Sequence, residues 1–334
     1  MRNNYSGSRP LLGRNDMKTA VIGVGHLGKI HARIVNENPN VELAAVVDAR
    51  AESAKETGEL YHVPYFTNVE DVIPMIDAAH VVVPTPLHYE VTKKLLLAGK
   101  HVLLEKPITT TVPEADELLK LAKEKDLILQ VGHVERFNPA IIGIQKILRD
   151  PIFIEVHRLS PFNIRGTEVS VVFDLMIHDI DIILHLVRSD VVDVQAVGVP
   201  VLTKTSDIAN ARLTFANGCV ANVTTSRISA DRMRKIRFFQ DDAYISLDYV
   251  EQKAKLKHRK EWQIVEEEIN FSGDQPLQSE IQSFVDCVKL GKSPEVTGED
   301  GRNALKVATM VEEAIKKHLA ELKTLRPGAK LPGE

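Results

Sequence analysis

The chain has 334 residues and a formal net charge of −4; 44% of its residues are hydrophobic and 26% are charged. At about 150 residues per domain, this length predicts two domains, and the composition is that of a globular protein. It excludes an intrinsically disordered chain, a collagen-like chain and a disulfide scaffold. A charge this close to neutral also argues against nucleic acid as the main partner.

We expect residues 1–16 to form a disordered tail, because they are polar and hold only Leu11 and Leu12 as an apolar pair. A secretory signal needs an apolar stretch of ~7–15 residues and a membrane span needs about 20, and the sequence shows neither pattern. Cys219 and Cys287 lie outside any CxxC pattern, so a reduced pair is expected. These features predict a cytoplasmic protein with no membrane partner.

From Lys18 to about Val131, short apolar runs alternate with helical patterns. Runs that are apolar throughout are typical of parallel strands covered on both faces, so the alternation predicts an α/β fold, a Rossmann doubly wound parallel sheet. Gly99 is predicted to end one helix, and Thr111 with Pro113 to begin the next. The expected strands are 19–22, 41–47, 79–83, 102–104 and 127–131, and the expected helices are 27–38, 51–60, 69–76, 89–98 and 113–125.

The first expected strand runs into a GxGxxG pattern that begins a helix, and Asp48 follows at the end of the second strand. This context is typical of a dinucleotide site, in which the glycines allow a tight turn, close approach of a pyrophosphate and close helix packing. The Asp48 carboxylate would bind ribose hydroxyls and repel a 2′-phosphate, so NAD is the expected cofactor; Arg50 weakens this preference over NADP. The expected cofactor contacts here are Gly23, Gly25, His26, Leu27, Gly28, Asp48 and Arg50.

A lysine stands at the end of the expected strand 102–104, in the run Gly99-Lys100-His101-Val102-Leu103-Leu104-Glu105-Lys106-Pro107. Groups at this edge of a parallel sheet face the crevice where ligands bind. Oxidation of an alcohol by hydride transfer requires removal of the hydroxyl proton, which a lysine with a lowered pKa can accept or relay. Burial beside a positively charged nicotinamide would lower that pKa. The alternative is a surface lysine paired with Glu105.

This run resembles the signature of the glucose–fructose oxidoreductase, inositol dehydrogenase and rhizopine-catabolism family of NAD(P)-dependent oxidoreductases. Two further segments are similar to that family: Pro84-Thr85-Pro86-Leu87-His88, beside the nicotinamide, and 299–305, in the closing helix. The resemblance spans Lys18 to about His318. It implies that Lys106 is catalytic and that Thr85, His88, Glu105 and Lys106 contact the cofactor.

Four polar residues, Asp174, His178, Asp181 and His185, interrupt an apolar helix predicted near 171–187. At ~100° per residue they form one narrow stripe, which must face a cavity or polar partners because isolated buried polar groups are costly. Asp174 and His178 match the family's DxxxH motif, which implies catalytic roles beside Lys106 and substrate contact for His178. Asp181 is interpreted as a helix anchor and His185 as structural. A metal site at His178, Asp181 and His185 is conceivable, but hydride transfer needs no metal and none is expected.

The segment between these two sites is dense in hydrogen-bonding groups: Gly132-His133-Val134-Glu135-Arg136-Phe137-Asn138-Pro139-Ala140-Ile141. It resembles the sub-branch of the family that acts on UDP-activated amino sugars, including UDP-N-acetylglucosamine 3-dehydrogenases. The resemblance implies that Glu135, Arg136 and Asn138 bind sugar hydroxyls or the N-acetyl group. The structural alternative is a helix start with Asn138 as N-cap and Pro139 at the first helical position, which is compatible with substrate contact by Asn138.

Beyond residue 150 the pattern alternates, which predicts an α+β domain with a largely antiparallel open sheet. Asn217-Gly218 predicts a type I′ hairpin turn. The predicted domains are a dinucleotide-binding domain at 17–138 and a substrate-binding and oligomerisation domain at 139–325, whose final helices brace both. The resemblance implies a homodimer or homotetramer formed through the sheet. The expected strands are 152–159, 193–201, 208–216, 219–226, 235–240, 244–249 and 264–269.

Several arginines of this half are candidate ligands for a diphosphate, because a forked guanidinium suits bidentate phosphate contact. Arg165 and Arg227 are the expected substrate contacts. For Arg232 and Arg234 a solvated charged hairpin is an equal alternative, and the basic run 253–260 is expected to be a solvated turn.

Together these features predict an NAD-dependent enzyme that oxidises a secondary hydroxyl of a sugar, with the 3-hydroxyl of a UDP-N-acetyl amino sugar as the expected group. The close alternative is the same chemistry on free inositol or a hexose polyol. A non-catalytic NAD-binding regulator is the alternative from another class, and the presence of both Lys106 and His178 argues against it.

Overall fold

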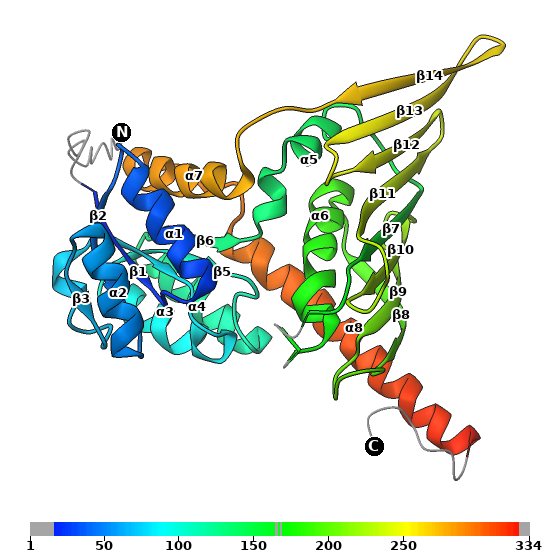
Figure 1. The fold of residues 1–334 in the computed structure, drawn as a ribbon. Helices are drawn as coiled ribbons and strands as arrows, with labels where there is room; N and C mark the ends of the chain where they lie inside the picture. The colour runs from blue at the N-terminus through cyan, green and yellow to red at the C-terminus, as the bar shows by residue number, and fades with distance from the viewer. Residues whose placement is uncertain (1–16, 164–165, 168, 327–334) are drawn as a thin grey trace, which may run out of the picture. The chain divides into compact units, whose positions relative to one another are not determined.

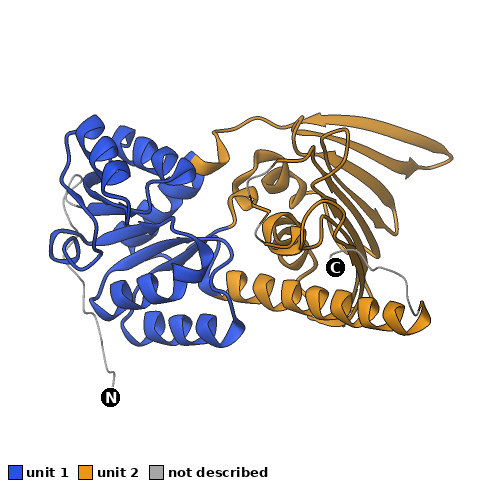
Figure 2. Ribbon diagram, turned by 60° about the horizontal axis from the view of Figure 1, so that its bottom comes forward, with its two compact units in different colours: residues 1–132, 278–298 blue, residues 133–277, 299–334 orange. Residues whose placement is uncertain are grey.

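The computed structural model describes residues 17–163, 166–167 and 169–326. Contacts between Cα atoms divide these residues into two compact units, coloured separately in Figure 2. Unit 1 comprises residues 17–132 and 278–298, and unit 2 comprises residues 133–277 and 299–326. The chain therefore leaves unit 1 at the end of a strand and returns to it for most of helix α7 (Pro276–Leu290).

Unit 1 is built on a parallel sheet with the strand order β3-β2-β1-β4-β5-β6. This is the strand order of a Rossmann dinucleotide-binding fold, and helices cover both faces of the sheet (Figure 2). The prediction of a doubly wound sheet is thus confirmed. Its strands are β1 (Lys18–Ile22), β2 (Glu42–Val47), β3 (Tyr65–Phe66), β4 (Ala78–Val81), β5 (His101–Glu105) and β6 (Leu129–Gly132), and the intervening helices are α1 (His26–Glu37), α2 (Ala51–Tyr61), α3 (His88–Leu97) and α4 (Val112–Glu124).

The predicted helix ends of unit 1 are found where the capping residues place them. Gly99, with φ +76°, follows α3, and its N–H donates to Leu96 O at 3.0 Å. Thr111 forms a reciprocal capping box with Glu114 at the start of α4. The helix expected at 69–76 is wrong: that segment holds only the 3-10 turn η1 (Ile73–Met75). Pro74 lies inside it, and a proline supplies no N–H to continue a helix.

Unit 2 contains a mostly antiparallel sheet in the order β14-β13-β12-β11-β7-β10-β9-β8, in which only β7 and β10 pair in parallel (Figure 1). The predicted α+β architecture is confirmed. The strands are β7 (Phe153–Leu159), β8 (Val191–Val199), β9 (Ile208–Phe215), β10 (Val220–Ser226), β11 (Met233–Gln240), β12 (Ala243–Asp248), β13 (Lys253–Lys260) and β14 (Gln263–Asn270); the helices are η3 (Val134–Phe137), α5 (Pro139–Ile144), a π-turn (Val172–Met176), α6 (Ile177–Val187) and α8 (Gly298–Leu325).

The core of unit 2 lies between one face of this sheet and the helices α6 and α8, which lie along that face (Figure 1). Alternate strand residues such as Ile154 and Val156 pack there with Ile180 and Ile183 of α6 and Ala308 of α8. Among the described residues of unit 2, no helix packs on the opposite face (Figure 1). None of the described helices combines the length and apolar character that crossing a membrane requires.

Two local predictions for this sheet are wrong. Residues 253–260, expected to be a turn, form strand β13, because its lysines pair with glutamates of β14; Lys257 Nζ lies 3.0 Å from Glu266 Oε2. Opposite charges facing each other across two strands add to the stability of the pairing, while Ala254 and Leu256 of β13 pack against the core of unit 2. The hairpin at Asn217-Gly218 is present, but only Gly218 has a positive φ (+88°), whereas a type I′ turn needs it at both central residues.

Candidate active site

The loop between β1 and α1 is open on one side and closely packed on the other. A Cβ on Gly23, which has φ +89°, would lie 2.5 Å from Val82 O, and one on Gly28 would lie 1.8 Å from Gly23 O. A Cβ on Gly25 would meet nothing within 4 Å. The turn itself therefore requires Gly23 and Gly28, while Gly25 lies where a pyrophosphate can approach the N-terminus of α1. These features fit a bound dinucleotide.

Asp48, at the end of β2, lies beside this loop. Its Oδ2 accepts the Val24 N–H at 2.9 Å and its Oδ1 accepts the Arg50 N–H at 2.9 Å. The Arg50 side chain is 69% exposed, with Nε 3.5 Å from Asp48 Oδ1. The structure thus brings together the glycine loop and the acidic residue predicted to bind the adenosine ribose, with Arg50 at the outer edge; His26 and Leu27 form the first turn of α1.

Lys106 directly follows β5, is partly exposed, and is joined to Pro107 by a cis peptide bond. The neighbouring His88 is 1% exposed and lies between two carbonyls, with Nδ1 2.7 Å from Pro107 O and Nε2 2.9 Å from Val83 O. Burial lowers the pKa of His88, and the two facing carbonyls act against this lowering. His88 thereby holds the segments after β4 and β5 together, and Thr85 begins the 3-10 turn η2 (Thr85–Leu87) just before it.

Glu105, the last residue of β5, is 9% exposed. Its Oε2 accepts the Lys106 backbone N–H at 3.3 Å and its Oε1 lies 3.2 Å from His31 Nε2. A Cβ on Gly132, at the end of β6, would lie 3.0 Å from this carboxyl group. The predicted cofactor contacts therefore all lie at the carboxyl edge of the sheet: Glu105 ends β5, Lys106 follows it, and Thr85 and His88 follow β4.

In unit 2, Asp174 lies within the π-turn that precedes α6, and His178 lies in the first turn of α6. Single π-turns within helices are frequent at functional sites. A Cβ on Gly166 would lie 2.9 Å from Asp174 Oδ2, so that glycine packs directly against the carboxyl group. The His178 ring meets the buried His133 ring edge-on, with centroids 6.4 Å apart. His133 directly follows β6, and no role was predicted for it from the sequence.

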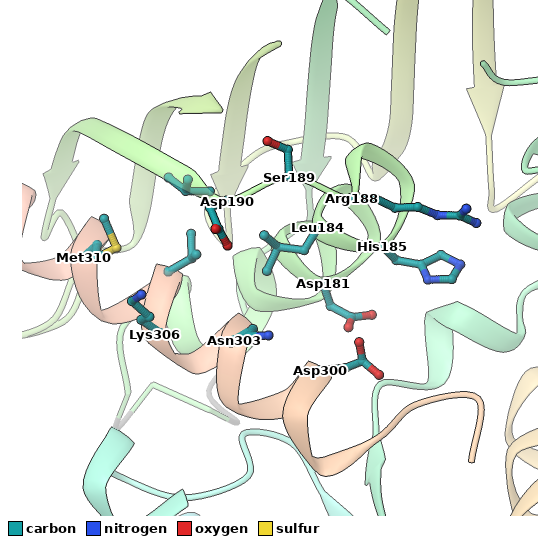
Figure 3. A pocket seen from close by; sticks show the side chains of 12 residues that line it. Asp181, Leu184, His185, Arg188, Ser189, Asp190, Asp300, Asn303, Lys306 and Met310 are labelled. Atoms are coloured by element: carbon teal, nitrogen blue, oxygen red, sulfur yellow. The ribbon is translucent and has the colours of Figure 1, made fainter. Parts of the chain in front are cut away.

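Asp181 and His185 lie further along α6 and line a pocket of about 300 Å³ between α6 and α8 (Figure 3). Asp181 is 2% exposed and accepts a hydrogen bond from Arg136 Nη1 at 3.4 Å, which suits the anchoring role predicted for it. Burial raises the pKa of Asp181 to about 7; Arg136 acts against this rise, and Asp300, whose carboxyl group faces Asp181 in Figure 3, adds to it. Burial lowers the pKa of His185 to about 4.

The predicted substrate contacts in residues 132–141 form hydrogen bonds and ion pairs with other residues of unit 2. Glu135, 7% exposed, accepts hydrogen bonds from Arg158 Nη1 at 3.2 Å and Arg234 Nη1 at 3.1 Å. Asn138, 5% exposed, caps α5 by accepting the Ala140 N–H at 3.0 Å. The buried Arg136 pairs with Asp181. The Asn138 cap is the one described by the structural alternative, and contact of the three residues with a substrate stays a prediction.

Arg158 is a buried charged residue that the sequence reasoning missed. From β7 it makes a bidentate ion pair with Asp179 of α6, and Asp179 also accepts a hydrogen bond from the Tyr249 hydroxyl. Burial raises the pKa of that hydroxyl well above its ordinary value, so Tyr249 is the donor. Residues 154, 156 and 158 of β7 point to the same face of the sheet, as every second residue of a strand does, so the sequence already indicated that Arg158 faces the core with Ile154 and Val156.

Arg227 is 3% exposed and its guanidinium binds the chain itself. It donates to Gly166 O at 2.7 Å, Val169 O at 2.6 Å and Ser206 O at 2.9 Å. Since Gly166 packs against Asp174, these bonds support the segment beside the predicted catalytic carboxylate rather than present a phosphate site. Arg165 lies outside the described residues.

The chain matches two family models, "Oxidoreductase family, NAD-binding Rossmann fold" over residues 17–133 and "GFO/IDH/MocA C-terminal domain" over residues 157–246. It is 35% identical to the UDP-N-acetylglucosamine 3-dehydrogenase of Acidithiobacillus ferrooxidans, covering 91% of this chain and 98% of that protein. A solved structure of the Acidithiobacillus enzyme superimposes with a TM-score of 0.86 at 36% identity, over 90% of this chain and 98% of that one.

Inositol dehydrogenases are also related. The myo-inositol 2-dehydrogenase of Thermotoga maritima is 26% identical over 93% of this chain and 98% of that protein. The structure of myo-inositol 2-dehydrogenase from Lactobacillus plantarum has a TM-score of 0.78 at 26% identity, over 90% of this chain and 98% of that one. The chain therefore belongs to the GFO/IDH/MocA family of NAD-binding oxidoreductases.

Proposed function

We propose that the chain is an NAD-dependent dehydrogenase that oxidises the 3-hydroxyl of a UDP-N-acetyl amino sugar. The observation that carries the substrate class is the likeness to the Acidithiobacillus UDP-N-acetylglucosamine 3-dehydrogenase, which extends over both units and 98% of that protein. The chemistry is supported by Lys106 at the carboxyl end of β5 and by the open glycine loop with Asp48 beside it.

In the proposed reaction, NAD+ bound at this site supplies a hydride acceptor. The substrate loses the hydrogen on its carbinol carbon as hydride, and Lys106 accepts or relays the hydroxyl proton, so that the carbinol becomes a ketone. His178 and Asp174 orient the reacting group. The π-turn, with Gly166 packed against Asp174 and Arg227 binding the Gly166 carbonyl, supports the geometry of that second pair.

The test is the formation of NADH, followed by absorbance, with UDP-N-acetylglucosamine, other UDP-sugars, myo-inositol and free hexoses as substrates. We expect turnover on UDP-N-acetyl amino sugars. Activity only on inositol or free hexoses would replace the proposed substrate by the alternative that the inositol dehydrogenase relatives favour. No turnover on any of them, with NAD still bound, would favour a regulator.

A variant separates catalysis from cofactor binding. Lys106→Met is expected to abolish turnover and to leave NAD binding within about threefold. Lys120→Met, which removes a lysine that is 74% exposed on α4, is the matched control and should keep full activity. If Lys106→Met lost both turnover and NAD binding, or kept both, Lys106 would not have its proposed role.

We further propose a cytoplasmic homo-oligomer that associates through the helix-free face of the unit 2 sheet. The rings of Phe153, Phe239 and Tyr244 form a row there, with centroids 5.4 and 5.1 Å apart, and Phe239 is 37% exposed. Cys219 and Cys287 are buried and form no disulfide, which suits a reducing compartment. Light scattering on a size-exclusion column tests the assembly: Phe239→Lys should shift the mass toward the monomer, 37.2 kDa.

A further inference from the structure

A chain of three buried polar side chains crosses unit 1 and ends at the residue before Lys106. His80 of β4 and His31 of α1 are both 0% exposed, and their Nδ1 atoms lie 3.2 Å apart. His31 Nε2 lies 3.2 Å from Glu105 Oε1, and Glu105 Oε2 accepts the Lys106 backbone N–H. The roles proposed above for the reaction do not use either histidine.

The direction of the hydrogen bonds between these three side chains follows from the protonation of His80. Two nitrogens at hydrogen-bond distance must be one N–H and one lone pair, and a neutral imidazole carries one proton. Burial and the neighbouring His31 lower the pKa of His80 well below its ordinary value, so His80 is neutral. His80 Nε2 has no hydrogen-bond partner among the described residues; the ring of Phe284 packs against this histidine at a centroid distance of 5.6 Å.

If the proton of His80 were on Nε2, a buried N–H would lack an acceptor, which folded proteins rarely tolerate. With the proton on Nδ1, His80 donates to His31 Nδ1, and His31 carries its own proton on Nε2. His31 then donates that N–H to Glu105 Oε1. The reverse direction, with a protonated Glu105 donating to His31, leaves the unpartnered N–H on His80. The chain is therefore directed toward a Glu105 carboxylate that accepts two N–H groups.

We propose that His80 and His31 are positioning residues that keep Glu105 ionised and oriented, so that its buried negative charge favours the oxidised, cationic nicotinamide over the neutral reduced form. This inference rests on the proposed function and on the nicotinamide contact predicted for Glu105 and Lys106. A charge that is largely removed from water acts strongly on a neighbouring charge. The charge therefore changes the ratio of the affinities for NAD+ and NADH, whereas a role in packing alone would change both equally.

The direction of the hydrogen bonds from His80 through His31 to Glu105 can be tested without a cofactor. In the full chain labelled with ¹⁵N-histidine, the His80 signals should show a protonated Nδ1 and a bare Nε2, and the His31 signals a protonated Nε2. Spectra of His80→Asn and His31→Gln assign the signals by their loss. A His80 ring protonated on Nε2 would overturn the proposal, because the hydrogen bond between the two histidines would then be donated by His31 and not by His80.

The charge role is tested by titrating NAD+ and NADH separately into matched variants. Asn at position 80 and Gln at position 31 keep an amide donor where the histidine N–H lies, whereas Leu at either position keeps none. We expect His31→Leu and His80→Leu to weaken NAD+ about tenfold more than NADH, and the amide variants to stay within about threefold of the wild-type ratio. Equal losses for both forms, or none, would reject the proposal.

Two further measurements keep this test decisive. Glu105→Gln removes the charge with little change of shape, so it should show the same loss of NAD+ preference even where a leucine variant fails to fold. His258→Asn, in a histidine of β13 that pairs with Glu267, is the control and should leave the ratio unchanged. Wild-type protein that binds neither NAD+ nor NADH would overturn the proposed function and this inference together, whereas normal binding of both with an unaltered Glu105→Gln ratio overturns the inference alone.

Discussion

Arg158 and Asp179 form a bidentate ion pair inside unit 2, with Arg158 Nε 2.7 Å from Asp179 Oδ2 and Nη2 3.0 Å from Oδ1. The two side chains are 2% and 0% exposed. Asp179 directly follows His178, so this pair ties the start of α6 to strand β7. The position of a proposed catalytic histidine thus depends on a charge pair in the core.

Arg158→Met is expected to lower the free energy of unfolding by about 3–5 kcal/mol, because it leaves the Asp179 carboxylate buried without its counter-charge. Urea denaturation followed by circular dichroism measures the change. Arg237→Met is the matched control. Arg237 pairs with Glu155 of the neighbouring strand β7, but these two side chains are 28% and 35% exposed, so the loss of the pair should cost less than about 1 kcal/mol. Equal effects of the two changes would contradict the buried role of Arg158.

The glycine loop gives a second prediction, in which stability and cofactor binding separate. Gly25→Ala should leave the unfolding transition unchanged, because its Cβ meets no atom within 4 Å, but should weaken NAD binding at least tenfold if the pyrophosphate lies against that position. Gly28→Ala should impair folding as well, since its Cβ would lie 1.8 Å from Gly23 O. Calorimetric titration with NAD and thermal melting measure the two effects. Undiminished NAD binding by Gly25→Ala would place the pyrophosphate elsewhere.

Features that depend on neighbouring residues could be read from the sequence. The turn at Gly23, the helix start at Thr111 and the N-cap at Asn138 depend on backbone conformations and hydrogen bonds within a few residues, and the structure shows each of them. The strand order of unit 1 follows from the alternation of strands and helices because right-handed crossovers leave few arrangements.

Features that depend on partners far along the chain were missed. Strand β13 has only a short apolar alternation, Ala254 and Leu256, and the opposite charges for its lysines come from the glutamates of β14. Arg158 meets Asp179, twenty-one residues away, and Tyr249, ninety-one residues away, only after β7, α6 and β12 have packed. The His80–His31–Glu105 chain likewise joins β4, α1 and β5, and none of the three residues has a local pattern that reveals it.

The position of Asp48 predicts the choice between NAD and NADP. Its carboxylate is held beside the glycine loop by the Val24 N–H, where it would repel a 2′-phosphate. Asp48→Asn should lower the ratio of kcat/KM for NAD over NADP at least tenfold. Arg50→Ala, in an arginine that is 69% exposed, should instead reduce whatever activity NADP supports and leave NAD unaffected. A wild-type enzyme that prefers NADP would show that Arg50 dominates this site.

The pocket between α6 and α8 predicts two opposing pH dependences of stability. Asp181 has its pKa raised from 3.8 in the unfolded chain to about 7, so it stabilises the folded state below about pH 4 relative to higher pH, and that stability is lost as the pH rises from 4 to 7. His185 has its pKa lowered from 6.5 to about 4, so stability is instead lost as the pH falls from 6.5 to 4. Between pH 4 and 6.5 the two effects oppose each other in the wild-type protein.

Substitution of either residue should therefore uncover the effect of the other. Asp181→Asn keeps an oxygen for the Arg136 hydrogen bond, and its melting temperature should rise relative to wild type as the pH increases from 4 to 7. His185→Gln should gain relative to wild type as the pH decreases from 6.5 to 4. Melting curves at half-unit steps of pH measure both differences. If Asp181→Asn ran parallel to wild type over this whole range, the Asp181 carboxyl would titrate at its ordinary pKa, and neither burial nor the facing Asp300 would be acting on it.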